Sequence, residues 1–355
     1  WRPDVVHCHD WHAAALPLQL RSRFAADPFW ADTPSVLTIH NLAFQGRYGD
    51  EMLPYTGLDL GLYFSGTLEF YGDINLLKGA IEVSNKVTTV SPRYAREIQT
   101  PEYGEGLDGV LGRRAADLHG ILNGIDYEVW NPQTDPYLPV PFTADTLAGK
   151  AAAKSELQRR FELPVRPEAP VFGIVSRLFA QKGIDLVCGA LGQLLAHDIQ
   201  LMVLGTGDPW IENQLLHAAH AHPDRVGVQL RYDASLAHLI QGGSDFFLMP
   251  SRYEPCGLSQ MCAFRYGTIP IVRRTGGLAD SVINVSPLTL RKGTATGLVF
   301  MPATDEAVAR SVQRAVELFA DKPTLAKVQQ AGMAQDFSWT RASQHYVALY
   351  EQLLA

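Results

Sequence analysis

The chain has 355 residues, of which 46% are hydrophobic and 19% charged, and its formal net charge is −7. This length and composition are typical of a globular protein with two domains that each bury a core. The net negative charge argues against nucleic acid or an anionic membrane as partner, because both call for a basic face. No apolar run reaches the roughly 18 residues of a membrane-spanning helix, so the sequence predicts no membrane segment.

The four cysteines, at positions 8, 188, 256 and 262, form no CxxC pair. Such spacing indicates reduced thiols, and we expect a cytoplasmic protein, or a plastid-stromal one if its source is a plant or alga. The chain opens at Trp1, almost directly on an apolar strand. We therefore expect an N-terminal truncation, and no leader peptide can be assessed.

The first 124 residues alternate between short apolar strands and helical stretches. Strands are expected near residues 4–7, 35–40, 86–90 and 118–122. Ser91 followed by Pro92 predicts a helix start, with Ser as the N-cap and Pro at the first helical position. About four strands are fewer than a doubly wound lobe usually carries. Residues 1–124 are therefore interpreted as an incomplete Rossmann-like lobe.

A Pro-rich irregular segment, residues 130–141, comes next and is interpreted as a linker. Beyond it the alternation of strand and helix is regular, which predicts a parallel sheet with right-handed crossovers. We assign residues 125–338 to a second Rossmann-like lobe, and residues 339–355 to a C-terminal helix that packs back on the first lobe. The expected fold is α/β, with two doubly wound lobes facing a cleft. The strands of the second lobe are expected at 171–176, 201–204, 226–230, 246–249, 269–272 and 297–300.

The strand ends of the second lobe carry the candidate binding and catalytic residues, because ligands of open α/β sheets bind outside the carboxyl ends of the strands. Cations and helix-start N–H groups at such an edge form a diphosphate site without a metal. Any single arginine at this edge can equally be an ordinary loop residue, so the diphosphate site is inferred from the whole set of residues. The GxG at Gly205 lacks the GxGxxG spacing and the distant acidic residue of dinucleotide enzymes, which disfavours hydride transfer. The residues concerned are Arg177, Lys182, Gly205, Arg231, Tyr232, Glu254, Arg273 and Arg274, with Tyr232 placed to stack on a base.

Six segments resemble, in their order and approximate separations, the signature blocks of the glycogen/starch synthase family. The resemblance covers essentially the whole chain and implies a GT-B fold. It also implies retaining transfer of glucose from ADP-glucose to the non-reducing end of an α-1,4-glucan, with no metal and no cofactor. The segments are HCHDWH (7–12), TIHNLAFQG (38–46), ILNGID (121–126), SRLFAQKG (176–183), SRYEPCGLSQ (251–260) and RRTGGLADSV (274–282).

The same resemblance implies the roles of single residues. Arg177 and Lys182 would lie against the donor diphosphate, and Glu254 would hold hydroxyls of the donor glucose near the forming positive charge. His40, in the first lobe, would approach the anomeric carbon. The family usually has Thr where this chain has Ser259, so a hydroxyl is kept. The further substrate-binding residues implied are Asp10, Asn123, Gly205, Tyr232, Cys256, Gly257, Leu258, Ser259, Thr275, Gly276 and Gly277.

Several of these residues have a structural alternative. Asp10 is also a good helix N-cap, Asn123 before a glycine favours a turn, and His40 can be bonded inside its own turn. The histidines of HCHDWH can be read as metal ligands, but an HxxxH spacing on one helix is absent. We therefore predict no metal site.

Three alternatives to a glycogen or starch synthase stay open. The chain can be another retaining two-lobed transferase, such as a sucrose or small-glucoside synthase, or a non-catalytic glucan-binding homologue. The intact Arg177, Lys182 and Glu254 argue against the non-catalytic alternative. A phosphorylase would need a lysine that holds pyridoxal phosphate. The resemblance also implies a Lys-Thr-Gly-Gly-type loop that this sequence lacks, so we expect the chain alone to be poorly active or inactive.

Overall fold

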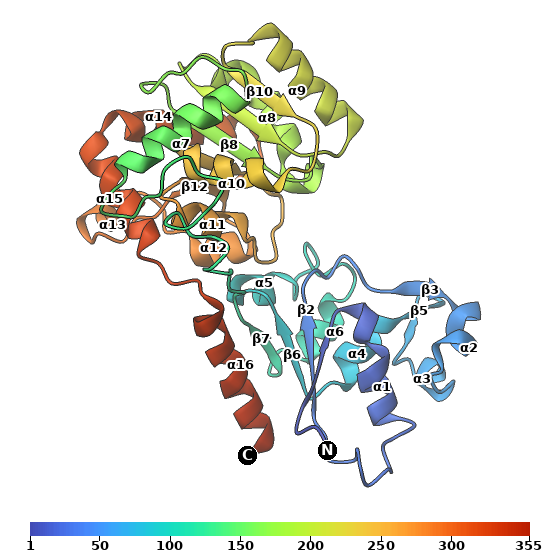
Figure 1. Ribbon diagram of the computed structural model, residues 1–355. Helices are drawn as coiled ribbons and strands as arrows, with labels where there is room; N and C mark the ends of the chain where they lie inside the picture. Colours follow the sequence, from blue (N-terminus) through green and yellow to red (C-terminus); the bar gives the residue numbers. More distant parts are fainter. The chain divides into compact units, whose positions relative to one another are not determined.

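The computed structural model describes residues 1–355, which divide into two compact units. The first contains residues 1–123 and 340–355, and the second contains residues 124–339. The division falls one residue from the expected boundary at 124/125, and α16 (Trp339–Leu354) belongs almost wholly to the first unit. Each unit is built on a parallel sheet with helices, so the predicted α/β class is confirmed (Figure 1).

The second unit holds a six-stranded parallel sheet of order β10-β9-β8-β11-β12-β13. This is the doubly wound order, in which the direction of winding reverses between β8 and β11, and every predicted strand is present. The elements are α7 Ala148–Arg160, β8 Val171–Val175, η3 Ala180–Lys182, α8 Ile184–Leu194, β9 Gln200–Leu204, α9 Pro209–Ala221, β10 Val226–Gln229, α10 Ala234–Gly243, β11 Phe246–Met249, α11 Ser259–Arg265, β12 Ile269–Arg273, α12 Gly276–Ser281, α13 Pro287–Arg291, β13 Leu298–Phe300, α14 Asp305–Ala320 and α15 Lys322–Met333.

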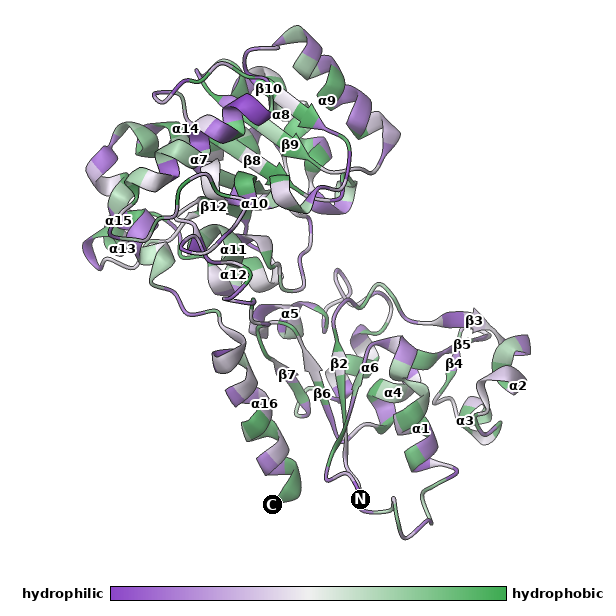
Figure 2. Ribbon diagram, in the orientation of Figure 1, coloured by the Kyte–Doolittle hydropathy of each residue, from purple (hydrophilic) through white to green (hydrophobic).

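Both faces of this sheet are buried, which is why its strands read as continuous apolar runs. Side chains alternate along a strand, so Phe246 and Leu248 of β11 join one core while Phe247 joins the other. Residues of α8 and α14 complete the first core, and residues of α7 and α10 complete the second. In Figure 2 hydrophobic residues run along β8 and β9, whereas the peripheral α9 carries hydrophilic ones. The sheet is thereby a rigid support for the loops at its carboxyl edge.

The segment 130–141 is irregular, as expected, but its interpretation as a linker is wrong. Asp135 is buried, and its carboxylate accepts hydrogen bonds from the Tyr266 hydroxyl and from His238 Nδ1, the latter over 2.7 Å. Trp130 stacks on His238 with ring centroids 3.9 Å apart. Leu138 is buried in the second core. The prolines keep the segment out of regular structure, while its polar and apolar side chains fix it to the second unit.

The first unit has a four-stranded parallel sheet of order β1-β2-β6-β7, with the four strands near the predicted positions. A small antiparallel sheet of order β3-β5-β4 was not predicted, because strands of two or three residues are too short to show a period. The elements are β1 Val6–His9, η1 Trp11–Ala13, α1 Ala15–Arg21, β2 Ser35–Ile39, β3 Arg47–Gly49, η2 Asp50–Met52, α2 Leu53–Thr56, α3 Gly61–Phe64, β4 Glu69–Phe70, β5 Asp73–Asn75, α4 Leu76–Val83, β6 Lys86–Thr89, α5 Pro92–Glu97, α6 Asp108–Arg113 and β7 Leu118–Gly120.

Helix α16 is tied to this first unit by side-chain contacts with β1. The Tyr350 hydroxyl lies 2.6 Å from His7 Nδ1, and the Tyr346 ring lies 5.6 Å from the His7 ring.

None of the helices of the chain combines the length and apolarity that a bilayer crossing requires. None of the four cysteines is in a disulfide, and three of them are buried.

Candidate active site

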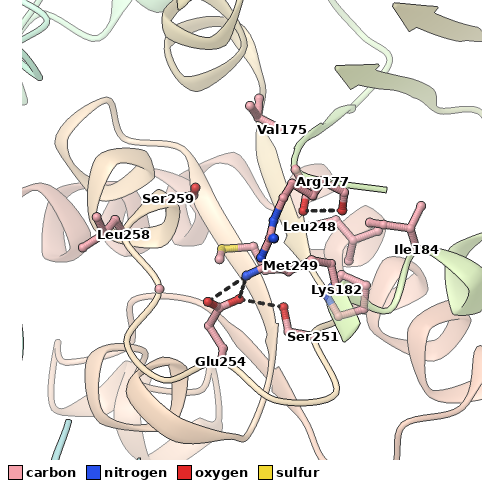
Figure 3. A pocket seen from close by; sticks show the side chains of 13 residues that line it. Val175, Arg177, Lys182, Ile184, Leu248, Met249, Ser251, Glu254, Leu258 and Ser259 are labelled. Atoms are coloured by element: carbon pink, nitrogen blue, oxygen red, sulfur yellow. Dashed lines mark hydrogen bonds and ion pairs between the residues drawn. The ribbon is translucent and has the colours of Figure 1, made fainter. Parts of the chain in front are cut away.

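A cavity of about 200 Å³ opens at the carboxyl ends of β8 and β11 in the second unit (Figure 3). The loops that follow these neighbouring strands supply its polar residues, as the strand-end rule predicts. The last two residues of the SRYEPCGLS loop lie at the start of α11 and complete the lining. The predicted residues that line the cavity are Arg177, Lys182, Glu254, Gly257, Leu258 and Ser259.

Lys182 and Glu254 form an ion pair across this cavity. The Lys182 Nζ donates to both carboxylate oxygens of Glu254, over 2.9 and 2.7 Å. The Glu254 side chain is only 8% exposed and that of Lys182 20% exposed, so the pair is shielded from water. The Ser251 hydroxyl donates to the same carboxylate over 3.0 Å, as the dashed lines in Figure 3 show. Sequence reasoning missed Ser251, although it lies in the same block.

Arg177 contributes a second cation to the cavity, and its guanidinium has no hydrogen-bond or ion-pair partner. Arg252 lies in the loop after β11. Its side chain donates to the Asp185 carboxylate over 2.7 Å and its backbone N–H donates to the carbonyl of Gln181, so this loop is held in place. An unpaired cation at the edge of this cavity can form charge-assisted hydrogen bonds to an anionic group, at the cost of ordering its exposed side chain.

The turn Thr275–Gly277 does not line the cavity but packs against the loop that carries Glu254. The Gly277 N–H donates to the carbonyls of Glu254 and Pro255, both over 3.1 Å. Gly276 has φ 42°, and a Cβ there would lie 1.9 Å from the Glu254 carbonyl oxygen. Only glycine therefore fits at position 276. These residues act on the site by positioning Glu254.

The remaining predicted residues of the second unit lie outside the cavity lining. Gly205 packs against the carbonyl of Ser176 at the adjacent strand end. Cys256 is a buried residue of the loop that carries Glu254, and its backbone packs against Gly277. The Tyr232 side chain is 94% exposed, so its predicted stacking on a base stays a prediction.

In the first unit, the structure brings Asp10 and His40 together. The His40 backbone N–H donates to Asp10 Oδ1 over 2.8 Å, and His40 Nε2 lies 3.0 Å from His9 Nδ1. The side chain of Asp10 makes no capping hydrogen bond, so the N-cap alternative is wrong. Asp10 also has φ 54°, a backbone conformation rare outside glycine that is concentrated at functional sites.

Two other polar residues of this unit, His7 and Asn123, differ from each other in their hydrogen bonding. The ring nitrogens of His7 lie 2.6 Å from the Tyr350 hydroxyl and 2.6 Å from Thr38 Oγ1. No group of three or more His, Cys, Asp or Glu side chains is gathered in the way a metal centre requires. Asn123 Oδ1 is buried and has no hydrogen-bond partner, and the contact of Asn123 with a substrate stays a prediction.

The histidine cluster predicts a pH dependence of stability. Burial, and then the neighbouring His9 and His40, lower the pKa of His7 to about 4. In the unfolded chain a histidine titrates near pH 6.5, so folding keeps His7 neutral. Its contribution to stability is fully present above pH 6.5 and is lost as the pH falls from 6.5 towards 4.

Replacing His7→Gln should therefore reduce the fall in Tm between pH 7.5 and pH 4.5, measured by circular dichroism. His345→Gln, at an exposed position on α16 of the same unit, is the matched control and should leave the fall unchanged. An equally steep fall in His7→Gln and in the unmodified protein would contradict the assignment.

Two parts of the chain match known protein families. Residues 1–113 match the starch synthase catalytic domain family, and residues 155–332 match the glycosyl transferases group 1 family. The glycogen synthase of Anaeromyxobacter dehalogenans (strain 2CP-C) is 47% identical over 352 residues, covering 99% of this chain and 73% of that protein. Glycogen synthase 1 of Methylococcus capsulatus is 46% identical over 359 residues, covering 100% and 71%.

A solved structure supports membership of the same family. The catalytic domain of starch synthase IV from Arabidopsis thaliana, bound to ADP and acarbose, matches with a TM-score of 0.92 at 35% identity, covering 99% of this chain and 73% of that one. The fold is thus that of the GT-B glycosyltransferases. The chain belongs to the glycogen/starch synthase family, and its reaction is glucosyl transfer to a glucan.

Proposed function

We propose that the protein transfers glucose from ADP-glucose to the non-reducing 4-hydroxyl of an α-1,4-glucan, with retention at the anomeric carbon. The observation that carries this is the cavity in which unpaired Arg177 lies near the Lys182–Glu254 pair. Two cations match the charge of a departing nucleoside diphosphate, and the carboxylate can accept hydrogen bonds from sugar hydroxyls. The ADP and acarbose bound by the starch synthase IV neighbour support this choice of donor and acceptor.

A front-face mechanism fits the charges in the cavity. The bond from the anomeric carbon to the diphosphate oxygen breaks, and the acceptor oxygen bonds to the same face while its proton passes to the leaving phosphate. A retaining mechanism with a covalent intermediate needs two carboxylates roughly 5 Å apart. Glu254 is the one carboxylate among the residues that line this cavity, which supports the front-face route.

The same cations support a reaction without a metal or an organic cofactor. Arg177 and Lys182 supply the positive charge that magnesium provides in many nucleotide-sugar enzymes. We also propose that the enzyme is cytoplasmic, and the absence of a disulfide among its four cysteines supports this.

The test is incorporation of labelled glucose into glycogen by the enzyme expressed from its complete gene. We expect activity with ADP-glucose to persist in excess EDTA, because arginine and lysine need no ion to bind the diphosphate. We also expect it to exceed activity with UDP-glucose, and the ADP bound by the starch synthase IV neighbour supports this preference. Digestion of the product by an enzyme specific for α-1,4 bonds checks retention. A strict requirement for Mg²⁺ or Mn²⁺, a preference for UDP-glucose, or transfer to fructose instead of glycogen would each overturn the proposal.

A further inference from the structure

The Glu254 carboxylate has two hydrogen-bond donors in the cavity of the second unit, and they hold its oxygens unequally. The Lys182 Nζ donates to both oxygens, over 2.9 Å to Oε1 and 2.7 Å to Oε2. The Ser251 hydroxyl donates to Oε2 alone, over 3.0 Å (Figure 3). Oε2 is therefore held by two side chains, whereas Oε1 is held by Lys182 only.

Ser251 approaches the carboxylate from a fixed backbone. It is only 2% exposed, and its hydroxyl makes this one side-chain hydrogen bond. On one side of it, Gly183 packs so closely on Pro250 that a Cβ there would lie 2.1 Å from the Pro250 carbonyl oxygen. On the other side, the Arg252 N–H donates to the Gln181 carbonyl over 2.8 Å. The hydroxyl is thus preorganised, and it can hold the carboxylate without further ordering of the loop.

The two donors respond differently to an anion in the cavity. The Lys182 ammonium is charged, so a phosphate group attracts it and weakens its bonds to the carboxylate. The Ser251 hydroxyl is neutral and buried, so its bond to Oε2 can persist. A buried carboxylate that loses all of its donors is strongly unfavourable. When the ammonium is drawn away, Ser251 is therefore the remaining side chain that holds Glu254.

We propose that Ser251 is a positioning residue for Glu254: it holds Oε2 while Lys182 is drawn to the donor diphosphate, and Oε1 is left to accept a hydrogen bond from a hydroxyl of the donor sugar. The inference rests on the proposed function, which supplies both the diphosphate and the sugar. The last torsion of a glutamate side chain has only broad minima, so a carboxylate without this bond can rotate. Ser251 acts on turnover through Glu254.

The test is Ser251→Ala, made in the enzyme expressed from its complete gene. We expect kcat for glucose transfer from ADP-glucose to glycogen to fall about tenfold, because a hydrogen bond to a charged group contributes on this scale. The KM for glycogen should stay within about twofold, since no contact with the acceptor is removed. The Kd for ADP, measured by calorimetry, should rise about fivefold, because ADP then draws Lys182 from a carboxylate that has no other donor.

A Glu254→Ala background separates positioning from a merely structural role. Without a carboxylate to hold, the addition of Ser251→Ala should change kcat and the Kd for ADP by less than about twofold. Ser251→Cys keeps a side chain of similar size with a weak S–H donor, and should recover part of the kcat lost in Ser251→Ala. A structural role would give the same loss in both backgrounds.

Ser311→Ala is the matched control. Ser311 is also 2% exposed, and its hydroxyl donates to the Ala307 carbonyl over 2.8 Å within α14, outside the cavity lining. Its kcat and Kd for ADP should be unchanged. The proposal is wrong if Ser251→Ala keeps more than half of the unmodified kcat, leaves the Kd for ADP unchanged, or loses as much kcat in the Glu254→Ala background, or if Ser311→Ala loses as much.

The proposed function fails by a different result, namely that the unmodified enzyme moves no glucose from ADP-glucose to glycogen. The ADP titration needs no turnover, so it tests the exchange of partners at Glu254 in that case as well.

Discussion

Arg177→Ala and Lys182→Ala are each expected to lower kcat about 10²–10³-fold in the enzyme expressed from its complete gene, because preorganised charges on a leaving group contribute on this scale. The two variants should differ in stability. The Arg177 guanidinium has no partner, so its removal should leave Tm unchanged. Lys182 neutralises the shielded Glu254, so Lys182→Ala should lower Tm while the circular dichroism spectrum at 25 °C stays that of a folded protein.

The measurement is initial-rate transfer of labelled glucose to glycogen at saturating donor, beside thermal denaturation. Arg166→Ala is the matched control, since Arg166 precedes β8 at the opposite edge of the same sheet and pairs with exposed Asp198. It should keep near-normal kcat. If Lys182→Ala retained more than half of the unmodified kcat, the assignment of the diphosphate to this cavity would be wrong.

Glu254→Gln is expected to lower kcat at least about 10²-fold, by removing the negative charge that faces the developing positive charge of the sugar. Its effect on nucleotide binding should have the opposite sign. In the unbound protein the Lys182 Nζ is held by both oxygens of Glu254, so a bound diphosphate must compete with this carboxylate for the ammonium. The neutral amide removes that competition.

Calorimetric titration with ADP separates the two effects. The Kd for ADP should fall in Glu254→Gln, and should rise in Lys182→Ala. Glu254→Asp is the matched control: it keeps the charge on a shorter side chain and should recover part of the lost kcat. Near-normal turnover in Glu254→Gln, or weaker ADP binding in that variant, would rule out the roles given to this pair.

The second unit was predicted closely because its physical signals are local. Each strand is a run of apolar residues buried on both faces, and each is followed by a helical stretch, so type and order can be read from periodicity alone. The strand-end rule then led to Arg177, Lys182 and Glu254, which do line one cavity. The family blocks carried the same information, because each of the two loops that form the cavity is one continuous segment that falls within a block.

Errors and omissions arose where the deciding contacts are distant in sequence. The segment 130–141 contains several prolines and resembles a linker, yet Asp135 is fixed by His238 and Tyr266, more than a hundred residues away. A cavity of the first unit lined by Trp11, Phe44 and Phe70 also escaped notice, because these residues come from three separate segments and show no shared period.

By itself, the sequence determined the α/β class, the two sheets, the family, and the residue types at the carboxyl ends of the strands, since all of these depend on local pattern and contiguous motifs. Only the tertiary structure decided how those residues are paired. It showed that Lys182 is held by Glu254 while Arg177 is unpaired, and that Asp10 receives the His40 N–H instead of capping a helix. Such pairings join residues 30 and 72 positions apart, and they depend on which strands become neighbours in a sheet, which no local pattern records.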